Sequence, residues 1–154
     1  MTAKNRILLV EDEASLRRSL ENYLERAGYA FECCSTARDA LVLAERHPPE
    51  IVIAEYHLPD ANGLGLLEKL TRIAPNLAGI LLSEYDFQVV AKDFVHVTVG
   101  SFLKKPFDLV EFEAALSSAR SKVKMASSVE NVEREQKSDF AGMPVSTFKG
   151  NSQG

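Results

Sequence analysis

Five side chains that can bind cations or anions follow apolar runs of the sequence. Glu11 and Asp12 follow "RILLV", Glu55 follows "IVIA", Ser83 ends "LAGILLS" and Lys105 follows "SFLK". Carboxylates that share one pocket cannot all ionise cheaply without a cation, and their hard oxygens suit Mg²⁺. A lysine facing them offsets charge and can hold an anion such as a phosphoryl group, to which a serine hydroxyl can donate. The residues therefore predict an ion-binding site, provided that the fold brings them together.

The elements that must position these side chains are apolar runs alternating with helical patterns. Strands are predicted at residues 6–10, 29–34, 51–54, 77–83 and 99–103, and helices at 16–27, 36–44, 63–74, 87–94 and 108–123. Gly28 stands where a left-handed helix C-cap is expected, and capping boxes open at Thr36 and Asp108. The stripe Leu109, Phe112, Leu116, Ala119 and Val123 is expected to be buried.

Strands that alternate with helices are parallel and are joined by crossovers, with helices on both faces of the sheet. The predicted fold class is therefore α/β, a doubly wound five-stranded parallel sheet with five helices. Ligands of such sheets bind beyond the carboxyl ends of the strands, at a topological switch point. All five candidate side chains lie at those ends.

Composition narrows the function classes. The 154 residues carry a formal net charge of −4, with 45% hydrophobic and 26% charged residues, which is typical of globular proteins and argues against a nucleic-acid-binding role. No apolar span of membrane or signal-peptide type is found, so a cytoplasmic protein without a membrane partner is expected. Cys33 and Cys34 are adjacent in a predicted strand, should point to opposite faces, and are interpreted as reduced structural thiols.

The helical pattern ends near Lys124. Residues 125–154 are rich in polar residues, and their apolar residues follow no fixed period. We therefore predict a domain at residues 1–124 and a mostly disordered tail at 125–154, with a helical extension near Val129 to Gln136 as an alternative for part of it.

From Arg6 to about Lys124 the chain resembles the receiver domain of two-component response regulators. The resemblance rests on "LLVEDE", "AEYHLPDANG", "ILLS" and "SFLKKPF" in this order and spacing. It implies the flavodoxin-like receiver fold, a histidine kinase or a downstream signalling protein as partner, and a possible homodimer through the last helix–strand–helix face. The chain is therefore not expected to be an enzyme.

The resemblance also implies roles for the strand-end residues. Asp12 would bind Mg²⁺ directly, Glu11 would reach it through water, and Lys105 would pair with the acceptor carboxylate or its phosphate. Ser83 would move toward the phosphate, and the ring of Phe102 would report the switch.

Glu55 departs from the family pattern, which has the phosphoacceptor aspartate at this position. The extra methylene moves the carboxylate outward by about 1.5 Å, the length of one bond, and phosphoryl transfer depends on in-line positioning. The sequence favours a pseudo-receiver that is not phosphorylated at Glu55 and acts by protein–protein interaction. Whether Glu55 mimics the active state, and whether the metal set Glu11, Asp12 and Glu55 still binds Mg²⁺, stay open.

Two alternatives remain. In the first, the chain is still a Mg²⁺-dependent receiver that accepts a phosphoryl group from a histidine kinase. In the second, it is an unrelated enzyme of similar fold, which should have a phosphate-binding glycine loop or a nucleophile elbow. The pair Gly63 and Gly65 precedes a helix, but Glu68 stands where the third glycine of a dinucleotide loop is required.

Overall fold

The computed structural model describes residues 5–92 and 99–141, and of residues 127–141 it describes the backbone alone. The strands are β1 (Arg6–Val10), β2 (Ala30–Cys34), β3 (Ile51–Glu55), β4 (Ala78–Ser83) and β5 (Ser101–Lys104). The helices are α1 (Ala14–Arg26), α2 (Ala37–Arg46), α3 (Gly63–Ile73), α4 (Phe87–Val90) and α5 (Leu109–Ala141). Strands and helices alternate along the chain as predicted.

The strands form one parallel sheet in the order β2-β1-β3-β4-β5. The central strand β3 is buried along its whole length, which explains why its sequence does not alternate with polar residues. The sheet order reverses between β1 and β3, where Val10 pairs with Ala54. This is the topological switch point, and Glu11 and Glu55 lie at its carboxyl end. The predicted fold class is confirmed.

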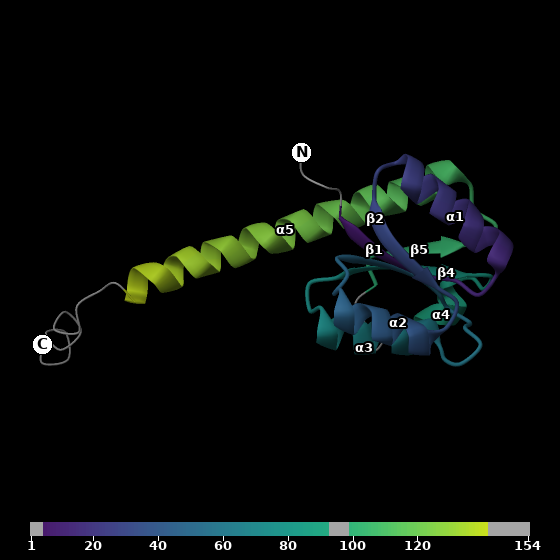
Figure 1. Ribbon diagram of the computed structural model, residues 1–154, viewed down its shortest axis with the longest axis horizontal. Helices are drawn as coiled ribbons and strands as arrows, with labels where there is room; N and C mark the ends of the chain where they lie inside the picture. Colours follow the sequence, from purple (N-terminus) through teal and green to yellow (C-terminus); the bar gives the residue numbers. More distant parts are fainter. Residues whose placement is uncertain (1–4, 93–98, 142–154) are drawn as a thin grey trace, which may run out of the picture. The chain divides into compact units, whose positions relative to one another are not determined.

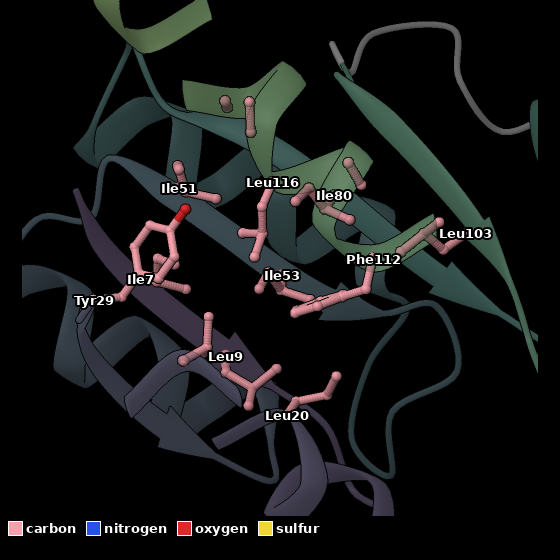
Figure 2. Close-up of a cluster of buried hydrophobic side chains, with 14 of the residues drawn as sticks. Ile7, Leu9, Leu20, Tyr29, Ile51, Ile53, Ile80, Leu103, Phe112 and Leu116 are labelled. Atoms are coloured by element: carbon pink, nitrogen blue, oxygen red, sulfur yellow. The ribbon is translucent and has the colours of Figure 1, made fainter. Parts of the chain in front are cut away.

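Two clusters of buried apolar side chains hold the helices on the sheet. On one face, side chains of β1 and β3 such as Leu9 and Ile53 pack against Leu20 of α1 and against Phe112 and Leu116 of α5 (Figure 2). On the other face, a second cluster joins α2, α3 and Val90 of α4 to the sheet. Figure 1 shows α1 on one face of the sheet and α2 and α3 on the other.

The predicted helix caps are present. Gly28 has a φ of 83° at the end of α1, a conformation that glycine adopts without a steric cost. The Thr36 hydroxyl accepts a hydrogen bond from the Asp39 amide at 3.1 Å, and the Asp108 carboxylate accepts one from the Glu111 amide at 2.8 Å. Each cap satisfies a backbone donor that the first turn of its helix leaves unpaired.

One residue of the predicted α5 stripe is exposed. Phe112, Leu116, Ala119 and Val123 are buried, whereas Leu109 is 57% exposed. The first α5 side chain in the core is that of Phe112, so the helix reaches the sheet one turn later than the stripe predicts.

The chain divides into two units, residues 1–123 and 124–154. Within the second unit, the structure continues α5 as helix to Ala141, where the sequence predicted a mostly disordered tail. No glycine or proline occurs between Pro106 and Gly142, so no residue in this stretch opposes a helix strongly. Residues 142–154 lie outside the described residues, and the domain assignment stays a prediction. Among the described helices, even the 33-residue α5 lacks an apolar stretch of membrane-spanning length.

The two cysteines behave as predicted from their place in β2. Cys33 packs against the cluster on one face of the sheet and Cys34 against the cluster on the other. Burial raises the pKa of Cys33 to about 11 and that of Cys34 to about 12, so both remain protonated thiols at neutral pH. Both are free cysteines, as expected for structural thiols.

Candidate functional site

The carboxyl edge of the sheet brings together four of the predicted site residues. Glu55 and Ser83 end β3 and β4, and Glu11 and Lys105 follow β1 and β5 by one residue. The Glu11 amide donates to the Cys34 carbonyl at 3.1 Å, and the Lys105 amide donates to the Ser83 carbonyl at 2.7 Å. These hydrogen bonds continue the ladder beyond the strands, so both side chains start from fixed backbone positions.

The Lys105 ammonium bridges two buried carboxylates. Its Nζ lies 2.7 Å from Glu11 Oε1 and 2.7 Å from Glu55 Oε2. The side chains of Lys105, Glu11 and Glu55 are 12%, 0% and 6% exposed, so solvent screens these ion pairs weakly. We call these three residues the Lys105 triad.

Burial and charge act in opposite directions on the triad. Burial raises the pKa of Glu11, while the contacts with Lys105 and the Glu13 amide oppose this rise. Burial alone would lower the pKa of Lys105, but its hydrogen bonds and charge interactions with Glu11 and Glu55 outweigh burial and raise it. Lys105 therefore stays positively charged at neutral pH.

The remaining oxygens of the triad carboxylates are also occupied. Glu11 Oε2 accepts a hydrogen bond from the Glu13 amide at 3.0 Å, and Glu55 Oε1 accepts one from the His57 amide at 3.2 Å. Within the described parts of the chain, Glu11 Oε1 and Glu55 Oε2 contact no polar group other than the lysine ammonium.

This donor set does not fit a divalent cation. Mg²⁺ requires near-octahedral oxygen ligands at about 2.0–2.1 Å, but an ammonium stands between the two buried carboxylates. Asp12, predicted as the direct ligand, is exposed, and the innermost carboxylate is that of Glu11. No three acidic, histidine or cysteine side chains are grouped to hold a metal in the part of the chain that the structure describes.

Ser83 and Phe102, the predicted switch residues, both have defined contacts. Ser83 is buried, and its hydroxyl oxygen accepts a hydrogen bond from the Tyr85 amide at 2.9 Å. The half-buried ring of Phe102 packs edge-to-face on Phe87 with centroids 5.5 Å apart. Phe87 itself is exposed.

A cavity of about 340 Å³ opens beside the triad. It is lined by Asp12, Glu13, Glu55, His57, Glu84, Tyr85 and Lys105. Four of these residues carry carboxylates and one carries an ammonium, so the cavity has an excess of negative charge. Such a charge balance disfavours a doubly charged phosphoryl group.

The sequence did not identify two residues that position the β3–α3 loop. At Gly63, an added Cβ would lie 2.2 Å from the Glu55 carbonyl oxygen, so only glycine allows α3 to begin against the end of β3. The Asp60 carboxylate accepts hydrogen bonds from the amides of Ala37 and Arg38 at 2.9 and 3.0 Å, which ties the loop to α2. Gly63 closes the turn before α3, so the sequence near it carries a signal that could have identified it. Asp60 carries no such signal, because its cap joins segments distant in sequence.

Comparison with known proteins gives one family. The model of the response regulator receiver domain matches residues 7–117, which contain β2 to β5, all of β1 except Arg6, and the whole Lys105 triad.

Individual relatives agree with this match. The chain is 32% identical over 114 residues to the transcriptional regulatory protein HptR of Staphylococcus aureus, covering 72% of this chain and 44% of that protein. It is 29% identical over 119 residues to the regulatory protein AtoC of Escherichia coli, covering 77% of this chain and 26% of that protein. The chain thus spans less than half the length of these curated relatives.

A solved structure matches over nearly its full length. The non-phosphorylated HemR receiver domain of Leptospira biflexa superposes with a TM-score of 0.70 at 30% identity, covering 77% of this chain and 95% of that one.

Proposed function

Because the chain belongs to the response regulator receiver domain family of two-component signalling, we propose that it is an atypical receiver that acts by protein–protein contact. In this proposal Glu55 takes the place of the phosphoacceptor aspartate and is not phosphorylated. The observation that carries the proposal is that a glutamate, and not an aspartate, ends β3 at the position whose carboxylate lies 2.7 Å from the Lys105 ammonium.

Three further features support a site that does not take up a phosphoryl group. The longer side chain of Glu55 moves the reactive oxygens by about 1.5 Å relative to aspartate, and misplacement of about 1 Å can lower rates by about 100-fold. The cavity places Asp12, Glu13 and Glu84 around the path of a negatively charged donor. The Ser83 hydroxyl oxygen accepts a hydrogen bond from the Tyr85 amide, which opposes a movement of this side chain toward a phosphoryl group.

The partner surface that we propose is the face formed by α4, β5 and α5. Phe87 and Val89 of α4 are exposed, and so is Tyr85 in the loop before α4. The Phe87 ring contacts Phe102 of β5. Exposed aromatic side chains are favoured in protein interfaces. A histidine kinase, a downstream signalling protein or a second copy of the chain could bind this face. One relative, HptR, is named as a transcriptional regulatory protein, so the exclusion of nucleic acid stays a prediction from charge.

The second candidate is a working Mg²⁺-dependent phosphoacceptor. This candidate is favoured by the presence of other residues of the family pattern at this edge of the sheet. Lys105 lies beside the acceptor position, and Ser83 ends β4. It requires Lys105 to leave Glu11 and the carboxylate of Glu55 to accept a phosphoryl group.

Beryllofluoride, which can occupy the place of a phosphoryl group on a carboxylate, separates the two candidates. Amide NMR spectra of the native chain and of Glu55→Asp are compared before and after its addition with Mg²⁺. We expect shifts around β3 and the β4–α4 loop in Glu55→Asp only, because the shorter side chain restores the acceptor geometry. The same shifts in the native chain would contradict the proposal, and so would a Glu55→Asp chain that folds normally and does not respond.

A further inference from the structure

The Lys105 ammonium lies where it can neutralise part of the negative charge of Glu11 and Glu55. The ammonium lies at 2.7 Å from a carboxylate oxygen of β3 and at 2.7 Å from one of the β1–α1 loop. It therefore occupies the point between the two buried acids where a bridging cation would otherwise be needed. Two negative charges and one positive charge share this buried space.

A divalent cation would have to displace this ammonium or approach within repulsive range of it. Displacement breaks two weakly screened ion pairs. Lys105 is restrained at its backbone by the hydrogen bond to the Ser83 carbonyl, and its side chain is only 12% exposed. The other acids that line the cavity, Asp12, Glu13 and Glu84, are exposed. Exposed carboxylates are weak ligands for Mg²⁺, because this ion gives up its water shell reluctantly.

We propose that Lys105 is a built-in substitute for the divalent cation, so that the native chain folds and holds this edge of the sheet without Mg²⁺. The inference deepens the proposed function and rests on it, since a receiver that takes no phosphoryl group has no need of a metal to neutralise one. The edge is then set in one arrangement by the chain itself, and its state does not follow the Mg²⁺ concentration.

The test is a titration with Mg²⁺ and with Mn²⁺, followed by calorimetry and by thermal unfolding after EDTA treatment. A site with a Kd of about 1 mM would raise the melting temperature by about 5 °C at about 10 mM metal. For the native chain we expect no such rise and no saturable heat. A one-to-one binding isotherm in the millimolar range or tighter overturns the proposal.

Lys105→Met removes the charge but keeps most of the side-chain stem. It leaves Glu11 and Glu55 without a cation, so we expect a melting temperature about 10 °C or more below that of the native chain in EDTA. Mg²⁺ or Mn²⁺ should recover much of this loss. Lys104→Met is the matched control, because Lys104 is 54% exposed and pairs with Asp86 away from the triad. Its melting temperature should change little and should not depend on metal.

Every outcome decides the proposal. If Lys105→Met folds and gains no dependence on metal, or if it binds metal no more tightly than the native chain, the proposal is wrong. If Lys105→Met does not fold in EDTA, the native titration decides alone. The titration contains no phosphodonor, so it measures metal binding independently of phosphorylation. A native chain that binds no metal in this titration, but is phosphorylated in a separate experiment, would contradict the proposed function and leave this inference standing.

Discussion

Replacing Gly63 with alanine tests how tightly the start of α3 is set against the end of β3. The new Cβ would lie 2.2 Å from the Glu55 carbonyl oxygen, about 1.2 Å inside the 3.4 Å at which ordinary contact begins. The three nearest atoms all lie within 3 Å and belong to the backbone, so no side-chain rotation can relieve the clash with them. The hydrogen bond from the Gly63 amide to the Tyr56 carbonyl, 2.6 Å long, should be disturbed as well.

The expected cost follows from these two effects. Overpacking a well-packed site costs about 1–3 kcal/mol, and a lost backbone hydrogen bond adds about 1 kcal/mol. The free energy of unfolding should therefore fall by about 2–4 kcal/mol. With a urea m-value of about 2 kcal/mol/M, the unfolding midpoint should fall by about 1–2 M.

Gly65→Ala is the matched control, because it places the same methyl group one half-turn further along α3. A Cβ at Gly65 meets no atom within 4 Å, and the residue is exposed in the helix. Alanine there should stabilise the chain by about 0.5–1 kcal/mol through helix propensity. Urea unfolding followed by far-UV circular dichroism measures both variants. Equal changes in the free energy of unfolding for the two variants, or a Gly63→Ala variant as stable as the native chain, would refute the geometry of the β3–α3 junction.

Three further predictions concern single side chains. Phe112→Ala should lower the free energy of unfolding by about 3–5 kcal/mol in urea titrations, because the ring is fully buried in the core; a loss below about 1 kcal/mol would contradict the packing. Ser83→Ala should cost about 1–3 kcal/mol, because it leaves the Tyr85 amide without its acceptor, whereas Ser83→Thr keeps the hydroxyl and should cost less. Amide hydrogen bonds from α2 lower the pKa of Asp60, so its contribution is present above the ordinary aspartate pKa of about 3.9 and is lost as the pH falls through the lower pKa of the folded chain. The difference in stability between native protein and Asp60→Ala should therefore shrink below about pH 4, and a difference that stays constant in this range argues against the cap.

The features that sequence predicts correctly are local ones. Gly28 closes a helical pattern in which it lies, and Thr36 and Asp108 each cap an amide three residues away. The order of strands and helices follows in the same way from the period of apolar residues. Such signals need no knowledge of which segments meet in space.

The features that it misses depend on tertiary contacts. Asp60 caps amides 22 and 23 residues earlier in the chain, and that contact exists only after α2 and the β3–α3 loop pack side by side. Leu109 fits an apolar stripe, yet it is exposed, because a stripe does not show where a helix first reaches the sheet.

The candidate site shows both cases. The strand-end rule predicts that Glu11, Glu55 and Lys105 meet, and the structure places them in direct contact. It does not predict that the ammonium bridges both acids, or that Asp12 stays exposed while Glu11 is buried. These outcomes depend on side-chain length and direction at one crowded edge.

The most direct test of the account is the intact mass of the native chain after incubation with Mg²⁺ and a small-molecule phosphodonor, run beside Glu55→Asp. Glu55→Asp serves as the positive control, because an adduct on this variant demonstrates that a labile phosphate can be detected under the same conditions. The account predicts a phosphate adduct on Glu55→Asp and none on the native chain, whose acceptor-position carboxylate is held by Lys105. An adduct on the native chain that maps to Glu55 would contradict it and identify a functioning receiver with glutamate as its acceptor.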